Sequence, residues 1–143
     1  MRHRTRPLLV REHAEALRLA RRLMRADAAS AADDRRALLL HWYGAGAAQL
    51  RAEEHVLLAA WARHGGDDHP LTAAIRAEHA RLAAAVAAIA ADPDASAERL
   101  REIGRALASH VRRQERELFG AVERILPDRE LAEVGAVLES LHA

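Results

Sequence analysis

Histidine, amide and carboxylate side chains stand close together in residues 110–119, in the middle of a long helical pattern. The inward positions of that pattern recur at steps of three and four: Ile103, Leu107, His110, Gln114, Leu118, Ala121 and Ile125. His110 and Gln114 therefore fall on the apolar stripe of an amphipathic helix. Burying a polar group without a hydrogen bond or a metal costs roughly 2–7 kcal/mol. We expect other helices to supply partners for this histidine and this amide.

Similar polar residues interrupt the inward stripes of three other predicted helices. They are His13 in the first helix, Gln49 and Glu53 in the second, and His79 in the third. Together with His110 they give three imidazoles and at least one carboxylate, a ligand set that suits Fe, Mn or Zn. The chain has no cysteine, so any metal must be held by nitrogen and oxygen atoms.

The helices that must position these residues are read from their start and stop signals. We predict helices over about 7–26, 30–64, 70–91, 96–126 and 129–141, with a capping box at Ser30 and Asp33 opening the second. Half of the residues are apolar but only 3% are aromatic, which favours helices packed through small side chains. Short connections imply antiparallel neighbours. The prediction is an all-α fold, an up-down antiparallel four-helix bundle with a short fifth C-terminal helix, forming one domain over residues 1–143.

In such a bundle the polar residues should meet at one level. Glu53 and His79 each lie about a dozen residues from the turn that joins their helices. His79 and His110 lie about 14 and 17 residues from the next turn, and at about 1.5 Å per residue the mismatch is roughly one helical turn or less. The four predicted helices therefore bring their polar groups to one layer.

Charge and hydropathy exclude several classes of partner. The 22 Lys and Arg balance 21 Asp and Glu, for a net charge of +1, so we expect no nucleic-acid binding. Arginine clusters at 21–22, 35–36 and 112–113 are interpreted as solvated helix faces. No apolar run is long enough for a signal peptide or a membrane span. We expect a cytoplasmic protein without a membrane partner, and its oligomeric state is left open.

These residues and motifs resemble hemerythrin-like domains of the HHE cation-binding type over nearly the whole chain. The resemblance is carried by Glu12-His13, by residues 51–58 (RAEEHVLL), by residues 78–82 (EHARL) and by residues 110–119 (HVRRQERELF). It implies a four-helix bundle that holds a non-haem, usually di-iron, centre between its helices.

The resemblance also implies which residues bind metal. His13, Glu53, His79 and His110 match family ligands, and Glu53 takes a metal-bridging place. Glu115 matches the second bridging carboxylate, five residues after the histidine of its helix. Glu12, Glu54 and Glu78 are expected to be exposed or to orient the histidines. His55 is expected at the surface or beside the ligands. The tryptophans and Phe119 are expected in the core, and Tyr43 could instead line a path to the metal or donate a hydrogen bond.

Two positions depart from the family pattern. Gln49 stands where the family has a histidine, and Gln114 stands where it has the first glutamate of a pair. In an ideal α-helix Gln114 lies about 40° from His110, whereas Glu115 lies about 140° away. A bulge in the helix is therefore required if Glu115 is to bind metal.

The altered ligand set leaves several functions open. The site could be an asymmetric di-iron centre, or a single metal bound by three histidines and Glu53, with Mn or Zn in place of Fe. An open coordination position is what chemistry on O2, NO or peroxide requires. We expect a protein that binds or senses O2, NO or iron. The first alternative is an iron-dependent oxidase or oxygenase of a small organic substrate, with room made by Gly44 and Gly46. The second is a metal-free polar layer that fixes helix register.

Overall fold

A computed structural model describes the backbone of residues 6–141 and the side chains of residues 13–141, and every regular element among them is helical. The predicted all-α class is confirmed. The elements are α1 (Arg6–Met24), α2 (Ala31–His41), η1 (Trp42–Gly46), α3 (Ala47–Ala62), η2 (Gly66–Asp68), α4 (Pro70–Ala90), α5 (Ala97–Arg113), η3 (Gln114–Leu118), α6 (Phe119–Ile125) and α7 (Asp128–Ser140). None of the described helices is long and apolar enough to cross a membrane.

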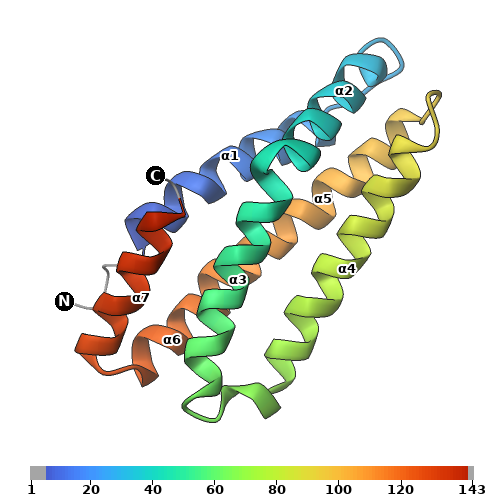
Figure 1. Ribbon diagram of the computed structural model, residues 1–143. Coiled ribbons are helices and arrows are strands. Elements are labelled where there is room, and N and C mark those ends of the chain that lie inside the picture. Colours follow the sequence, from blue (N-terminus) through green and yellow to red (C-terminus); the bar gives the residue numbers. More distant parts are fainter. Residues whose placement is uncertain (1–5, 142–143) are drawn as a thin grey trace.

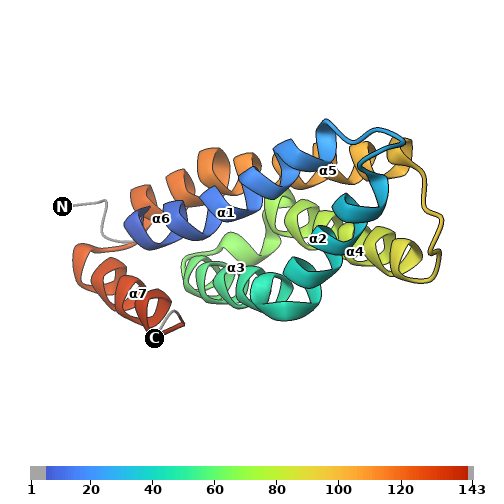
Figure 2. The ribbon, with the colours of Figure 1, turned by 90° about the horizontal axis from the view of Figure 1, so that it is seen from above.

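The long helices lie side by side in a bundle (Figure 1). α2, η1 and α3 form one continuous helical segment, and α5, η3 and α6 form another. α5 packs against both α1 and α4, while α3 packs against α6 and α7. The view from above shows the short α7 beside α3 and beneath the start of α1 (Figure 2). This arrangement surrounds the centre of the bundle with residues from α1, α3, α4 and α5.

Local sequence signals explain most of the helix ends. His69 caps α4 by accepting a hydrogen bond from the Leu71 amide at 3.0 Å, and Pro70 follows at the first helical position. Ser96 caps α5 by accepting from the Arg99 amide at 3.2 Å. Gly65 has a φ of 88° after α3, a conformation that glycine adopts without strain.

The predicted capping box at Ser30 and Asp33 is wrong. The Ser30 hydroxyl donates to Asp34 at 2.7 Å and accepts from the Asp27 amide at 3.0 Å, whereas Asp33 is exposed. Arg22 of α1 donates to the same Asp34 carboxylate at 2.8 Å. The start of α2 is therefore stabilised by the contact of Ser30 with Asp34 and by the ion pair of Asp34 with α1.

Two hydrophobic clusters make up the core, and the polar residues lie between them. The first cluster contains the C-terminal half of α1, residues of α2 and α4, and α5 up to Val111. The second contains α3 from Leu57 onwards, Ile75 of α4, Leu118 and residues of α6 and α7. His79 and His110 are buried at the boundary between the two clusters. The predicted layer of polar groups thus separates two apolar cores.

Two π-helical turns change the phase of the long helices. Trp42–Gly46 (η1) interrupts the α2–α3 segment, and Gln114–Leu118 (η3) interrupts the α5–α6 segment. A π turn adds one residue, so the positions after it are rotated relative to an ideal α-helix. A Cβ atom added at Gly46 would lie 2.7 Å from the His41 backbone oxygen and 2.5 Å from its ring nitrogen Nε2. Glycine is therefore required at this point of η1.

Candidate metal centre

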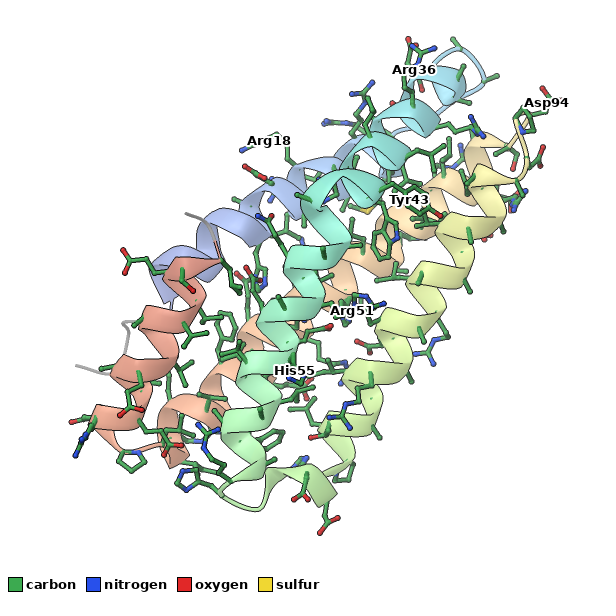
Figure 3. All side chains as sticks on the ribbon, viewed as in Figure 1. Arg18, Arg36, Tyr43, Arg51, His55 and Asp94 are labelled. Atoms are coloured by element: carbon green, nitrogen blue, oxygen red, sulfur yellow. The ribbon has the colours of Figure 1, made fainter. Side chains whose placement is uncertain are left out.

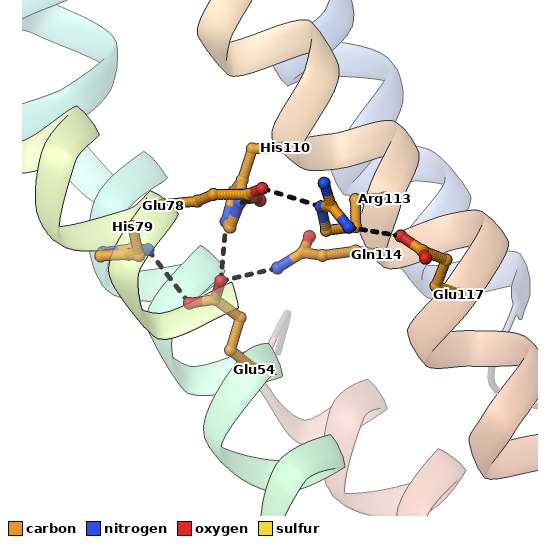
Figure 4. Close-up of polar contacts among 7 residues, drawn as sticks. All are labelled: Glu54, Glu78, His79, His110, Arg113, Gln114 and Glu117. Carbon is orange, nitrogen blue, oxygen red and sulfur yellow. Dashed lines mark hydrogen bonds and ion pairs between the residues drawn. The ribbon is translucent and has the colours of Figure 1, made fainter. Parts of the chain in front are cut away.

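The first group of candidate ligands meets at Glu54 of α3 (Figure 4). One carboxylate oxygen, Oε1, lies 2.7 Å from Nε2 of His110 in α5, and the other, Oε2, lies 3.0 Å from Nδ1 of His79 in α4. All three side chains are buried, and their ligand atoms lie within 4.8 Å of one another. Three helices thus converge on a volume that a single cation could fill.

Neighbouring side chains fix the orientation of His110. Its second ring nitrogen, Nδ1, lies 2.9 Å from Oε1 of Glu78. Both ring nitrogens therefore face a carboxylate, and at least one of them donates a proton to it. Gln114 donates from its amide nitrogen to Oε1 of Glu54 at 2.8 Å. The expectation that Glu78 orients a histidine fits this contact. Gln114 presents its nitrogen to the carboxylate, so it acts here as a donor to Glu54.

A chain of ion pairs runs from this group to the surface. Arg113 donates from Nε to Oε2 of Glu78 at 2.7 Å and from Nη1 to Glu117 at 2.8 Å. Figure 4 shows these contacts in sequence from Glu117 through Arg113 and Glu78 to His110. A change at the surface can therefore reach an imidazole of the centre through two side chains.

The second group surrounds His13 of α1, which is 1% exposed. Its Nε2 lies 3.7 Å from Glu53 of α3, and its Nδ1 lies 3.5 Å from Glu115 of η3. Glu115 faces inward because η3 rotates the helix after Gln114. The bulge that Glu115 requires is therefore present. Gln114 contacts Glu54 of the first group, and the next residue, Glu115, contacts His13 of the second. Phe119 stacks on the His13 ring with centroids 5.5 Å apart.

Several buried polar atoms of the centre lack hydrogen-bond partners in the part of the chain that the structure describes, which suits binding of a cation. Within the described residues, Nδ1 of His13, Nδ1 of His79 and Oε1 of Gln114 have no hydrogen-bond partner. The two ring nitrogens lie near carboxylates, but their contacts lack hydrogen-bond geometry. Unpartnered buried polar atoms are costly. A cation bound in each group, between imidazole and carboxylate, would satisfy the ring nitrogen of that group.

Burial and charge set the protonation of these groups. Burial raises the pKa of Glu54, but its contacts with His110 and His79 outweigh that effect and hold the pKa below 4.5. Burial lowers the pKa of His110, yet Glu54 and Glu78 raise it above 6.5. For His13 burial dominates and lowers the pKa below 6.5, despite the opposing field of Glu115. His13 is therefore neutral near pH 7, while the proton on His110 is stabilised by two carboxylates.

The model of one protein family matches residues 5–122, that of the hemerythrin HHE cation-binding domain. The chain belongs to this hemerythrin family. The match spans α1 to α6 and includes both groups of candidate ligands, so the resemblance seen in the sequence is confirmed. Comparison with curated proteins and with solved structures gives no significant match. Metal binding is the shared property of this family, and the buried Glu54, His79 and His110 could hold such a metal.

The structure of this hemerythrin-family chain distributes the expected ligands over two groups. His79 and His110 lie with Glu54, whereas His13 lies with Glu53 and Glu115. Glu54 was expected to be exposed or to orient a histidine, and it is buried between the imidazoles of His79 and His110. Gln49 is half-buried, and Leu50 takes the buried position one turn before Glu53 and Glu54.

The phase shift in η1 explains why the sequence pattern missed Glu54. An ideal helix carried forward from Trp42 puts Gln49 and Glu53 inward and leaves Glu54 at the side. Counting back from buried Trp61 at steps of four, three and four gives Leu57, Glu54 and Leu50, which are all buried. This spacing, counted back from Trp61, was the signal in the sequence that could have identified Glu54 as buried.

The tryptophans and Phe119 are buried, as expected, whereas Tyr43 lies at the surface. Trp42 packs near His79 with ring centroids 5.8 Å apart, and Phe119 covers His13. His55 is exposed on α3, as predicted. Tyr43 is 58% exposed, so it lies outside the core, and it points away from the bundle as His55 does (Figure 3). Neither residue contributes to the two groups.

Proposed function

We propose that this hemerythrin-family chain binds non-haem iron at two neighbouring positions and uses the centre to bind or sense O2 or NO. The proposed frame is an up-down bundle of four helical segments, with α7 as an addition. The two proposed positions are formed by Glu54, His79 and His110, and by His13, Glu53 and Glu115. Gln114, beside Glu115, completes the polar layer.

The pairing of consecutive residues carries the proposal of two positions. Glu53 and Glu54 follow each other in α3, yet one faces His13 and the other faces His79 and His110. Gln114 and Glu115 of η3 divide in the same way. Consecutive Cα atoms are about 3.8 Å apart, so two cations held by such pairs would be close neighbours. Bound iron would supply Lewis acidity and open coordination for a small ligand.

The space beside the candidate ligands favours a diatomic ligand over an organic substrate. A small cavity of about 10 Å³ lies against His13, His41, Trp42 and Gly46. A volume of roughly 10–15 Å³ on this scale admits about one water molecule. A larger groove of about 370 Å³ between α4 and α5 is lined by Glu78 but by none of the three histidines. Oxidation of an organic substrate is therefore not favoured.

The roles of the chain's own residues follow from their contacts. Glu78 keeps a proton on Nδ1 of His110, which leaves Nε2 as the ligand atom. The Glu54 carboxylate offsets cation charge in a region where Glu54 is only 6% exposed. Leu50 and Trp42 give the cavity next to His13 an apolar lining.

Elemental analysis of protein purified without added metal tests the proposal. Iron, manganese and zinc would be counted per chain, and absorption spectra would be recorded without oxygen, then with NO, and then with O2. We expect two iron atoms per chain and a reversible spectral change with NO or O2. The His110→Ala variant should lose iron, whereas His55→Ala, on the exposed face of the same bundle, should retain it.

Other metal counts would contradict the proposal in different ways. One iron per chain would indicate a mononuclear centre. No bound metal after reconstitution with Fe(II) would leave a hydrogen-bonded polar layer that fixes helix register. Iron without any response to O2 or NO would remove the ligand-binding role and leave iron binding alone.

A further inference from the structure

A basic groove runs along the outer face of α5 and η3, on the far side of His110 from the bundle centre. It is an open depression of the surface with a volume of about 460 Å³. Arg105, Arg112, Arg113 and Arg116 line it, with Glu117 as its only acidic lining residue among those described. Four guanidinium groups against one carboxylate give the groove a strong positive charge, although the whole chain is nearly neutral.

Most of this positive charge has no carboxylate partner among the side chains that the structure describes. Arg113 forms ion pairs with Glu78 and Glu117. Arg105, Arg112 and Arg116 are exposed, and they form no ion pair within residues 13–141. Other arginines, such as Arg22 and Arg63, do have carboxylate partners. Three of the four guanidinium groups in the groove therefore have no carboxylate partner among residues 13–141.

The spacing of these groups suits two adjacent phosphoryl groups. Arg112 and Arg116 are four residues apart in the chain, and both line the groove. Guanidinium groups bind phosphate oxygens in pairs of hydrogen bonds. Met24 and Ala108 add an apolar surface to the groove. We propose that the groove binds a small organic anion carrying a diphosphate, and that Arg113 transmits its binding to His110.

The contacts of Arg113 provide the route for that transmission. Its guanidinium holds Glu117 at 2.8 Å and Glu78 at 2.7 Å, and Glu78 in turn lies 2.9 Å from Nδ1 of His110 (Figure 4). An anion in the groove competes with both carboxylates for Arg113. Any shift of Arg113 toward the groove changes the charge felt by Glu78, and so the hydrogen bond that Glu78 makes with His110.

A titration of the full chain with inorganic pyrophosphate tests the proposal, using calorimetry for binding and the His110 ring resonances in NMR for transmission. It would be done on protein as purified and after metal removal, with NMR on the metal-free sample. We expect pyrophosphate to bind more tightly than inorganic phosphate. Binding should weaken by about tenfold or more in Arg112→Ala/Arg116→Ala, since charge-assisted hydrogen bonds are lost. Neither readout requires iron, so failure of the iron proposal would leave this result unaffected.

Matched variants separate a specific site from general attraction. Arg51→Ala/Arg76→Ala removes the same charge from exposed positions of α3 and α4 and should leave binding unchanged. Glu117→Gln removes a competitor for Arg113 and should tighten binding. The His110 resonances should move with pyrophosphate in the wild-type chain and stay fixed in Arg112→Ala/Arg116→Ala.

Three results would overturn the proposal. The first is equal binding by the groove variant and the control variant, which would indicate only general charge attraction. The second is binding to anionic phospholipid vesicles without binding of soluble pyrophosphate, which would make the groove a membrane-surface contact. The third is pyrophosphate binding with no change at His110, which would refute transmission through Arg113.

Discussion

At the scale of single residues, Glu54 is the side chain on which the centre depends most. It contacts His79, His110 and Gln114 from three directions, and it is the only carboxylate in the compact group of candidate ligands found among the described residues. The histidines around it were expected from their spacing. A buried carboxylate between two imidazoles explains both the lowered pKa of Glu54 and the raised pKa of His110.

Replacing Glu54 by glutamine should weaken metal binding strongly while leaving the helices intact. The amide keeps the size of the side chain but removes its negative charge, so cation affinity should fall by at least about tenfold. A competition titration with a chromophoric chelator measures the change. Glu102→Gln, at an exposed position of α5, is the matched control and should bind metal as the wild type does. Equal affinities in the two variants would show that Glu54 is not a ligand.

Metal affinity should rise with pH because a proton competes for His110. Glu54 and Glu78 raise the pKa of His110 above 6.5, so this imidazole is still partly protonated at pH values where an ordinary histidine is neutral. Metal binding must displace that proton, so affinity increases as pH rises through the raised pKa and then levels off. In Glu54→Gln the pKa of His110 should fall, and the plateau should begin at lower pH. The same titration at several pH values measures both curves.

At the scale of helices, the two π turns decide which residues face the centre. η3 lets Gln114 reach Glu54 while Glu115 reaches His13, which an ideal helix forbids. η1 sets the phase of α3, so that Leu50 and Glu54 face inward with Glu53. η1 precedes Glu53 and Glu54 by about two helical turns, whereas η3 itself contains Gln114 and Glu115. The altered phase, and not only the residue types, therefore defines the centre.

The glycine in η1 offers a direct test of this dependence. In Gly46→Ala the new Cβ would clash with the backbone oxygen of His41, so we expect a loss of roughly 1–3 kcal/mol in the free energy of unfolding. Gly44→Ala is the control in the same turn, where a Cβ would meet no described atom within 4 Å. Alanine is favoured over glycine in helices by about 0.5–1 kcal/mol, so Gly44→Ala should be neutral or stabilising. Chemical denaturation measures both, and equal effects would contradict the close contact at Gly46.

The sequence predicted the helices better than it predicted the centre, for reasons that these elements make clear. Apolar spacing, Pro70 and Gly65 marked the helix ends, and the same spacing placed His13, His79 and His110 inward. A π turn leaves no comparable mark, so the position of Glu54 was lost when the phase of an ideal helix was carried through η1. The contact of Arg113 with Glu78 joins two helices, and spacing along one helix does not specify it.

At the scale of the whole molecule, the polar layer joins two hydrophobic cores. One core holds residues of α1, α2, α4 and α5, and the other holds residues of α3, α6 and α7 with parts of η3 and α4. Between them lie buried histidines and carboxylates. Within the described residues, the Nδ1 atoms of His13 and His79 have no hydrogen-bond partner. A cation bound there links helices that belong to both cores. Metal binding should therefore stabilise the folded molecule as a unit.

Removing the metal should lower the melting temperature and make unfolding less cooperative. A ligand that binds only the folded state contributes about 2.7 kcal/mol when its free concentration is a hundred times its Kd. Calorimetry of the protein as purified, after chelation and after Fe(II) is restored, should show a fall in Tm and then its recovery. The transition without metal should broaden or divide, because the two cores lose the link between them. His110→Ala should melt at one temperature whatever the metal content, whereas His55→Ala should respond as the wild type does. A wild-type Tm that is unchanged by chelation would mean that hydrogen bonds alone hold the polar layer together.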